Sequence, residues 1–483
     1  MKESRWQTLT ARIATSVVVF MLVSGGHVMP VRAQSLDIPS SSVLEAQRVA
    51  NSLRLASKLL CSGVFVSGRP AERVIEEDLH WSQYNFFDWQ NVSWQIDRAK
   101  GTTRLELNSP SHSKVTLLAE SLFEEGYGCS LLPDSATGLL LSRPARIVSK
   151  DSPVSELPRA QPDIELERVL DWAFDSDNGY GQQDTRAVLV VKDGALLAER
   201  YASGFDAAKP QLGWSMGKSI AAILLGAYAL QSNLDIDAPV SIDPWQRGDD
   251  PRRAVTPRHL LNMAAGLRFA NPSFGDMLYY TELHDHESVY FRAQDVASFV
   301  LGQPLQHVPG EQFAYRNTNT LGIMALLRQK LGDERFFRFA DEALFSKIGA
   351  ASMTLETDIA GNPIISGFVY GTARDWARLG LLVLNDGVVD EKRVFPAGWR
   401  DEVLLQPSPA NKRYGGQMWL NATQSMAGVP ADTGYFLGWG GQVVLVVPSE
   451  NLVLVRLGLS EDAYFDYLDE LTKRVLQAIE RSG

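Results

Sequence analysis

Ser215 and Lys218 have the residue types and the spacing of a nucleophile and its base. They lie in the stretch 211–230, in which Lys218 is the only charged side chain. A helix that is apolar on every side is buried, and burial of an unpaired ammonium favours loss of its proton. Residues three apart on a helix share one face. A desolvated amine beside a hydroxyl activates that hydroxyl as a nucleophile.

The spacing of this pair is a weak signal when it is taken alone. A lysine in a core helix can extend its ammonium to the surface while its methylenes stay buried, and Lys218 would then have no chemical role. A second Ser-x-x-Lys pattern, Ser111 to Lys114, lies in a polar segment where nothing desolvates the amine. Further partners are therefore needed before a reaction can be assigned to Ser215.

Residues 213–217 also match G-x-S-x-G, the nucleophile motif of α/β-hydrolases. That motif requires a buried strand before the serine, but residues 205–211 are polar and contain a proline. A Ser-His-Asp mechanism also requires a histidine base. The four histidines after the serine are His259, His284, His286 and His307. His259 lies in a short amphipathic helix, where we expect a structural role, and His284 and His286 lie among acids, where we expect solvent exposure. The α/β-hydrolase class is therefore disfavoured.

Composition and the N-terminal segment indicate an exported protein of two or three packed units. The chain has 483 residues, 45% of them hydrophobic, and its net charge of −11 disfavours nucleic acid as a partner. Residues 1–33 resemble a secretory signal with a basic start, an apolar run and a small-residue cleavage site. The run is shorter than the about 20 residues that span a bilayer. We expect a periplasmic or secreted protein without a stable membrane anchor.

Cys61 and Cys129 are the two cysteines of the chain. Because an exported protein meets an oxidising environment, we expect a disulfide between them. Two separate buried thiols are the alternative. No spacing of Cys and His resembles a zinc site, and the sequence predicts neither a metal nor a cofactor.

The first unit, residues 34–143, is predicted to be a small α+β region. Residues 144–163 are rich in proline, serine and charges, which is typical of a linker. Within the first unit we expect helices over 43–60 and near 73–79, and short strands at 64–66, 104–107, 115–118 and 139–141.

The second unit, residues 164–483, is predicted to have one antiparallel sheet made by strands from both of its ends. Asp193-Gly194 is a strong hairpin signal. A mostly helical region lies between the two groups of strands, so the fold class is α+β with a helical subdomain. The expected strands are 187–191, 195–201, 417–421, 442–447 and 452–457. The expected helices include 164–174, 373–384 and one from 464 to 479, and the stretch 211–230 is expected to be a turn that runs into a helix.

Three motifs stand in order along this unit: Ser215-Met-Gly-Lys218, Tyr315-Arg-Asn317 and Trp439-Gly440-Gly441. Together they resemble the serine β-lactamase-like hydrolases, specifically the class C branch. The resemblance covers about residues 164–483 and implies the β-lactamase/transpeptidase-like fold. That branch includes β-lactamases, D-alanyl-D-alanine peptidases, esterases and 6-aminohexanoate-oligomer hydrolases.

The resemblance implies roles for the first two motifs. Ser215 is the nucleophile, and Lys218 favours its deprotonation and can take the proton itself. Tyr315 is expected to approach Ser215 and to pass the proton to the leaving group, although a tyrosine after Pro-Gly is often only a half-buried anchor. Asn317 is expected to hydrogen-bond Lys218 and the substrate amide.

The third motif departs from the pattern of the family. Where the family has Lys or His followed by Thr or Ser, this chain has Trp439 and Gly440. Tryptophan cannot bind the carboxylate of a β-lactam or of a peptide terminus, so the change favours neutral ester or amide substrates. Packing at the sheet edge is the alternative for Trp439. Gly440 and Gly441 are expected to let substrate lie along the strand edge, and the backbone N–H groups of Ser215 and Gln442 to form the oxyanion hole.

These observations predict an exported serine hydrolase that cleaves a small ester or linear amide through an acyl-enzyme with a Ser-Lys-Tyr centre. A β-lactamase or cell-wall D,D-peptidase of the same fold is the first alternative. The second is a catalytically silent binding protein, which the intact Ser215, Lys218 and Tyr315 disfavour. Residues 269–291, rich in Tyr, His and acids, are expected to shape the pocket.

Overall fold

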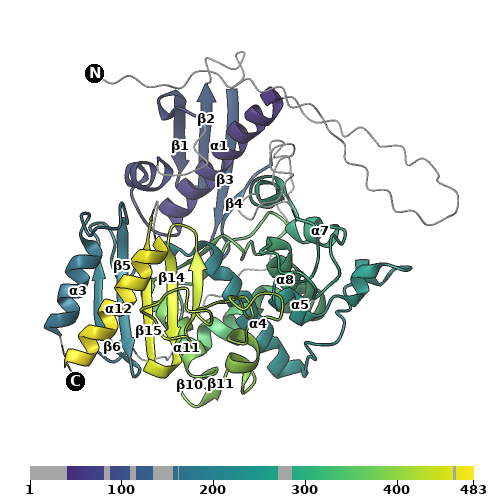
Figure 1. Ribbon diagram of the computed structural model, residues 1–483. Coiled ribbons are helices and arrows are strands. Elements are labelled where there is room, and N and C mark those ends of the chain that lie inside the picture. The colour runs from purple at the N-terminus through teal and green to yellow at the C-terminus, as the bar shows by residue number, and fades with distance from the viewer. Residues whose placement is uncertain are drawn as a thin grey trace, which may run out of the picture. The chain divides into compact units, whose positions relative to one another are not determined.

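Strands from both ends of the second unit form one antiparallel sheet, as the sequence predicts. The computed structural model describes residues 41–80, 87–108, 116–133, 156–161, 163–269, 285–460 and 464–482. The strand order is β12 (Trp419–Leu420), β13 (Gly434–Gly438), β14 (Gln442–Val447), β15 (Leu452–Gly458), β5 (Thr185–Lys192) and β6 (Ala195–Tyr201). The pairing of β15 with β5 joins the C-terminal strands to the earlier ones (Figure 1).

The turn between β5 and β6 is the predicted hairpin. Asp193 and Gly194 have φ values of 52° and 77°, and two successive positive φ values are typical of a type I′ turn. Near the C-terminus one strand prediction was inaccurate and one strand was missed. The strand expected at 417–421 pairs only over 419–420, and β13 was not predicted, because glycines at both of its ends weaken the strand pattern.

Alternate side chains of the central strands face two different cores. One set packs against α3 (Ile164–Phe174) and α12 (Tyr464–Ser482). The other set faces α11 (Ala373–Leu384), which lies directly against β5, β14 and β15. Helices therefore cover both faces of the sheet (Figure 1), which explains why its strands are continuous apolar runs.

The region between the two groups of strands is mainly helical. α4 (Gly217–Ser232) is buried along most of its length, as predicted for a helix without a polar face. It packs against α8 (Asn317–Leu331). A small sheet in the order β7 (Gln211–Leu212), β9 (Val369–Gly371), β8 (Thr354–Leu355) leads into it. The further α-helices of this region are α5 (Pro257–Leu261), α6 (Asp285–Glu287), α7 (Val296–Leu301), α9 (Asp333–Ala340) and α10 (Ser346–Ile348).

The described residues from 41 to 133, here called the N-terminal lobe, form a second antiparallel sheet with a long helix on it. α1 (Ser41–Phe65) packs against this sheet. The short helices α2 (Ala71–Val74) and η1 (Ile75–Leu79) follow, close to the helix predicted near 73–79. The strands pair in the order β1 (Val92–Asp97), β2 (Thr102–Asn108), β3 (Thr116–Glu124) and β4 (Gly128–Leu131).

Some predictions for this lobe were wrong. Val64 and Phe65, expected in a strand, are the last residues of α1. Val64 is buried in the core of the lobe, so the apolar face of the helix outweighs the local strand preference. β1 and β4 were not predicted. The strand expected at 139–141 and residues 144–155 of the expected linker lie outside the described residues, and the domain boundaries there stay predictions.

The lobe is joined to the second unit by a shared core and is closed internally by a disulfide. Cys61 of α1 and Cys129 of β4 form the predicted bond, with their Cα atoms 6.1 Å apart. Side chains of α1 and β2 pack in one apolar cluster with Trp214, Phe269 and Phe368 of the second unit. The lobe therefore lies next to the segment that contains Ser215.

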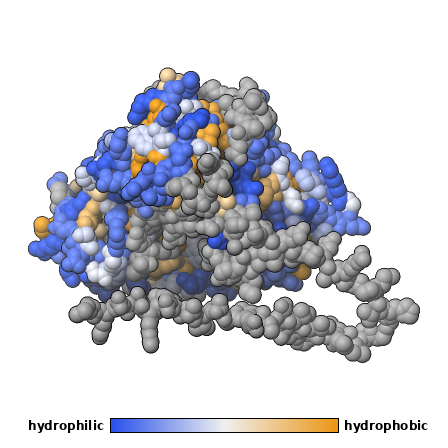
Figure 2. All heavy atoms as spheres, turned by 90° about the horizontal axis from the view of Figure 1, so that it is seen from above, coloured by the Kyte–Doolittle hydropathy of each residue, from blue (hydrophilic) through white to orange (hydrophobic). Residues whose placement is uncertain are grey.

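Where Figure 2 colours the surface by hydropathy, it is mostly hydrophilic, with smaller apolar patches between polar residues. Of the large apolar side chains on the lobe, Trp94 and Leu118 are 36% and 40% exposed.

None of the described helices has both the length and the apolar composition that crossing a bilayer requires. The predicted signal, residues 1–33, lies outside the described residues.

Candidate active site

Ser215 lies in one 3₁₀ turn, Trp214–Met216, immediately before α4. Trp214 has a φ of 47°, in the left-handed region that a bulky residue rarely adopts. Packing holds this conformation, because the Trp214 ring lies 5.7 Å from that of Phe368 and 5.3 Å from that of Trp439. Strained backbone of this kind concentrates at functional sites. The turn places Ser215 at the N-terminal end of α4, where the helix dipole favours negative charge.

Lys218 is buried, with 1% of its surface exposed. Its Nζ atom lies 3.0 Å from Ser215 Oγ and 2.7 Å from the backbone oxygen of Ser366. Burial lowers the pKa of Lys218 from 10.5 to about 7. A substantial fraction of the amine is therefore neutral at neutral pH and able to accept the proton of Ser215. The structure brings together the two residues that the sequence singled out.

Tyr315 faces the same amine. The centroid of its ring lies 4.9 Å from Lys218 Nζ. Aromatic neighbours fix the ring on its other sides, with centroids 5.4 Å away for Trp419 and 5.9 Å away for Tyr414. Burial, and then the charge of an ionised Tyr315, raise the pKa of Tyr414 well above its usual value. Tyr414 is therefore a neutral packing partner, which leaves Tyr315 as the half-buried phenol next to Lys218.

Asn317, the first residue of α8, has a partner that the sequence did not indicate. Its amide nitrogen donates to Tyr290 Oη at 3.0 Å, and His286 Nδ1 lies 3.5 Å from the same nitrogen. Between these two described residues, the expected hydrogen bond from Asn317 to Lys218 is not formed, because the Lys218 amine is bonded to Ser215 and Ser366. Tyr290 Oη also lies 3.3 Å from Ser366 Oγ. Tyr290 belongs to the segment 269–291 that was expected to shape the pocket, but its composition did not distinguish this tyrosine from its neighbours.

The third motif forms the turn between β13 and β14, beside the segment before Ser215. Gly440 and Gly441 have φ values of 73° and 78°, which a residue with a side chain rarely adopts. A methyl group on Gly438, at the end of β13, would lie 2.1 Å from the backbone oxygen of Gly213. The glycines thus allow a close approach of the motif to the nucleophile turn.

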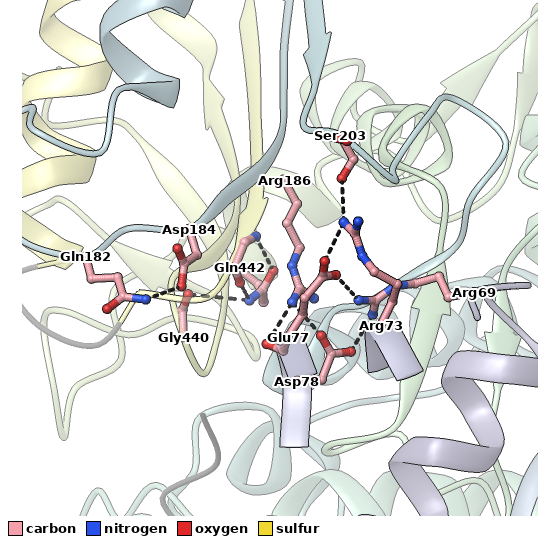
Figure 3. A network of polar contacts seen from close by, with 11 residues as sticks. Arg69, Arg73, Glu77, Asp78, Gln182, Asp184, Arg186, Ser203, Gly440 and Gln442 are labelled. Atoms are coloured by element: carbon pink, nitrogen blue, oxygen red, sulfur yellow. Dashed lines mark hydrogen bonds and ion pairs between the residues drawn. The ribbon is translucent and has the colours of Figure 1, made fainter. Parts of the chain in front are cut away.

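Gln442 and Arg456 hold this turn in place. The guanidinium of Arg456 donates to the backbone oxygens of Gly440 and Gly441, both at 3.1 Å. Gln442 Oε1 accepts from the backbone N–H of Gly458 at 3.0 Å, and its amide nitrogen donates to Gly440 (Figure 3). The side chain of Gln442 therefore stabilises the turn. That its backbone N–H donates to the oxyanion stays a prediction.

Ser366 was missed by the sequence analysis, although its backbone oxygen is the shortest contact of the Lys218 amine. Its role comes from a carbonyl group, which every residue possesses, so no residue type marks it.

His259 has the structural position that its sequence context predicted. Its Nδ1 atom accepts from the backbone N–H of Thr256 at 3.2 Å, and Thr256 Oγ1 accepts from the backbone N–H of His259 at 3.2 Å. Burial lowers the pKa of His259, partly opposed by Asp237. This capping box begins α5. Among the described residues, no group of three His, Cys, Asp or Glu side chains is placed to hold a metal ion.

A protein-family model described as Beta-lactamase matches residues 178–476, more than half of the chain. The chain belongs to the β-lactamase family. This confirms the resemblance drawn from the three motifs and the predicted α+β fold. It also makes the chain a hydrolase of the serine β-lactamase fold.

Three relatives of this β-lactamase-family chain illustrate the similarity. The 6-aminohexanoate-dimer hydrolase of Paenarthrobacter ureafaciens is 25% identical over 266 residues, which are 54% of this chain and 67% of that protein. The structure of a proposed 6-aminohexanoate-dimer hydrolase from Bacillus anthracis matches with a TM-score of 0.55 and 19% identity, over 68% of this chain and 89% of that one. A proposed β-lactamase from Bacteroides dorei gives 0.52 and 17%, over 66% and 98%. The two structures share the fold of this family member.

Proposed function

We propose that this β-lactamase-family protein hydrolyses a small ester or linear amide through an acyl-enzyme on Ser215, with Lys218 and Tyr315 as proton-transfer partners. One observation carries the proposal: a buried, partly neutral amine lies 3.0 Å from the Ser215 hydroxyl and faces the ring of Tyr315. That arrangement joins a nucleophile to a base whose pKa is close to the working pH.

The first half-reaction follows from these positions. Neutral Lys218 accepts the proton as Ser215 Oγ bonds to the substrate carbonyl carbon, and the carbonyl electron pair moves onto oxygen. The backbone N–H groups of Ser215 and Gln442 would hold that charge, and loss of one such donor typically slows turnover by about 10²- to 10³-fold. When the bond to the leaving group breaks, Tyr315 relays the lysine proton to it.

Water completes the reaction. It attacks the acyl-enzyme carbonyl and gives its proton to the same groups, and Ser215 leaves with a proton as the ester bond breaks. The products are a carboxylic acid and an alcohol or amine. No further reactant is needed for this balance.

The substrate class is inferred from the third motif and from a relative. Trp439 packs against Trp214 with ring centroids 5.3 Å apart, so the position that holds Lys or His in the family's third motif has an aromatic ring and offers no cation to a carboxylate. A neutral acyl group fits that ring better than an acid. One relative is named for hydrolysis of a 6-aminohexanoate dimer, which supports a linear amide.

Parallel assays with four substrates and one covalent probe test the proposal. We expect p-nitrophenyl butyrate or a linear amide to be hydrolysed, and a fluorophosphonate to label Ser215, with little turnover of nitrocefin or of a D-Ala-D-Ala peptide. Ser215→Ala is the control for background hydrolysis. Preferential turnover of nitrocefin or of the peptide would assign the protein the function of a β-lactamase or of a D,D-peptidase of the same family. Failure of every probe to label Ser215 would indicate a silent binding protein.

Export is a separate part of the proposal and rests on residues 1–33 alone. Expression of the full chain in a Gram-negative host should yield a periplasmic protein that begins at Gln34. Mass spectrometry of the purified protein measures its N-terminus. A cytoplasmic product that retains residues 1–33 would contradict export without affecting the proposed chemistry.

A further inference from the structure

Glu356 is fully buried where the N-terminal lobe meets the second unit. Three groups of the lobe hold its carboxylate. Lys58 Nζ lies 2.9 Å from Oε2, and the Ser62 hydroxyl and the Cys129 backbone N–H donate to Oε1 at 2.6 and 2.8 Å. The same ammonium of Lys58 donates to the backbone oxygen of Cys129. A buried ion pair with additional hydrogen bonds has a narrowly defined geometry.

The backbone of Glu356 holds a turn of the second unit. Its N–H donates to the oxygen of Phe368 at 3.0 Å, and its oxygen accepts from the N–H of Ile364 at 2.8 Å. A bond of 2.9 Å from the Phe368 N–H to the Ile364 oxygen closes the turn. Both ends of the turn 364–368 are thus tied to a residue whose side chain is held by the lobe.

The centre of this turn presents Ser366 to the catalytic lysine. The Ser366 oxygen accepts from Lys218 Nζ at 2.7 Å. No side chain separates the turn from the start of α4, because a methyl group on Gly217 would lie 2.1 Å from the backbone oxygen of Ile365. A displacement of the turn would therefore reach the amine directly.

Two further contacts press the lobe onto the same segment. The ammonium of Lys58 lies 4.5 Å from the ring centroid of Phe368. The hydroxyl of Ser130 donates to the backbone oxygen of Thr357 at 2.8 Å. The lobe thus contacts Phe368 at the end of the turn, and it also contacts Thr357, the residue after Glu356.

We propose that Lys58 and Glu356 are positioning residues, through which the N-terminal lobe holds the Ser366 carbonyl against Lys218 and keeps water from that amine. This assigns the lobe a part in the reaction, although neither residue touches substrate. The inference rests on the proposed function only in so far as Lys218 is the base. The effect of Lys58 and Glu356 on the pKa of the Lys218 amine can be measured without turnover.

The direction of the effect follows from the cause of the lysine pKa. Burial is what lowers the pKa of Lys218 to about 7. A loosened turn would admit water, which stabilises the ammonium and raises the pKa towards its ordinary value. Loss of the Ser366 acceptor alone would act in the opposite direction. We expect the gain of water to dominate, because burial is what lowers the pKa of Lys218. The titratable side chain that lies against this amine is Tyr315.

The lobe offers a matched control at its second ionic contact with the other unit. Arg69 pairs with Glu77 and Asp78, and Arg186 of β5 reaches Asp78 from the opposite side (Figure 3). Arg69 is 5% exposed and Lys58 is 1% exposed, so both are buried basic residues of the lobe. The ion pairs of Arg69 lead through Asp78 to Arg186 of β5, and among the described residues Arg69 makes no hydrogen bond or ion pair with the turn 364–368.

The test compares the full-length protein with Lys58→Met, Lys58→Met/Glu356→Gln and Arg69→Met. The double variant removes both charges, so no carboxylate is left buried and unpaired if the single variant fails to fold. The pKa of Lys218 is measured by NMR of ¹³Cε-lysine protein, with Lys218→Met to assign the signal. The rate of Ser215 acylation by a p-nitrophenyl ester is measured from pH 5 to 9.

In Lys58→Met we expect the Lys218 pKa to rise by about one unit and acylation at its plateau to slow by about tenfold, the scale of a small misplacement of a catalytic group. The double variant should show at least half of the shift in pKa, and Arg69→Met none. An unchanged Lys218 pKa in the folded Lys58 variants, or an equal change in Arg69→Met, would overturn the positioning role. Absence of acylation in the unaltered protein would instead contradict the proposed function.

Discussion

The burial of Lys218 has opposite consequences for chemistry and for stability. It provides a base at neutral pH, but the folded protein holds this lysine with a pKa of about 7 against 10.5 for an exposed lysine. The unfolded chain therefore binds more protons between these two values. Because stability rises with pH wherever the unfolded state binds more protons, the cost of burial is largest below pH 7 and disappears towards pH 10.5.

Replacement of Lys218 by methionine should therefore stabilise the protein. Methionine keeps a long apolar side chain without the charge, so at pH 6 we expect the free energy of unfolding to rise by about 2 to 4 kcal/mol. Urea unfolding between pH 6 and 10 measures it. The gain should shrink as the pH rises towards 10. A gain that is constant with pH would mean that Lys218 titrates at its ordinary value.

Activity should depend separately on the amine and on the phenol. We expect Lys218→Ala and Tyr315→Phe each to reduce ester turnover by at least about 10²-fold, since each removes a proton-transfer partner. Turnover in the unaltered protein should rise as the pH increases through about 7, because Lys218 loses its proton there. Circular dichroism checks that each variant is folded. Near-normal turnover in either variant would remove that residue from the mechanism.

At the scale of elements, the site is a meeting of three backbone segments. The 3₁₀ turn with Ser215, the start of α4 and the turn 364–368 approach so closely that glycine is required at Gly217. The small sheet of β7, β8 and β9 holds the segments on either side of these turns. The geometry of the lysine thus depends on backbone packing as much as on side chains.

Gly217→Ala should displace the turn 364–368 from the start of α4. Its methyl group would lie 2.1 Å from the Ile365 oxygen, so the turn must move, at a cost of about 1 to 3 kcal/mol. We also expect at least about tenfold slower acylation. Gly322→Ala in α8 is the control, because its methyl group would lie 3.1 Å from the end of the Leu260 side chain, which can shift. Equal acylation in both variants would argue against the importance of the turn.

The disulfide ties α1 to β4 within the N-terminal lobe. Replacing Cys61 and Cys129 by alanine opens a loop with a sequence separation of 68 residues, which should destabilise the protein by about 4 kcal/mol on the chain-entropy model. Thermal unfolding with and without a reductant measures the effect. If the double variant unfolds like the parent protein, the loop is constrained by the packing of the lobe and not by the bond.

At the scale of the whole molecule, the lobe and the second unit share one hydrophobic core. Side chains of α1 and β2 lie in the same cluster as Trp214 and Phe368, which flank the nucleophile and the turn. The ion pair between Lys58 and Glu356 is buried at this contact. Separation of the two parts would expose apolar side chains and leave a buried carboxylate without its partner.

A fragment of residues 156–483 should therefore fail to form a stable enzyme. We expect it to be largely insoluble, or soluble without a cooperative unfolding transition and without acylation of Ser215. Expression of the full chain under the same conditions is the control. A soluble, cooperatively folded and fully active fragment would show that the lobe contributes neither stability nor geometry to the site.

The sequence by itself determined the residues with local signatures. Ser215 and Lys218 were found from their spacing in an apolar helix, the β5–β6 hairpin from Asp193-Gly194, and the sheet from apolar runs, because each signal lies within a few neighbouring residues. The family motifs located Tyr315, whose ring the structure places beside the amine.

Only the tertiary structure decided what completes the site. The Ser366 carbonyl is 148 positions from Lys218 in the chain, and the carboxylate of Glu356 is 294 positions from Ser62. Backbone carbonyls have no residue signature, and a buried ion pair appears in the sequence as two ordinary charges. Such contacts arise from packing between distant segments, so the arrangement that keeps the lysine dry cannot be found from local patterns.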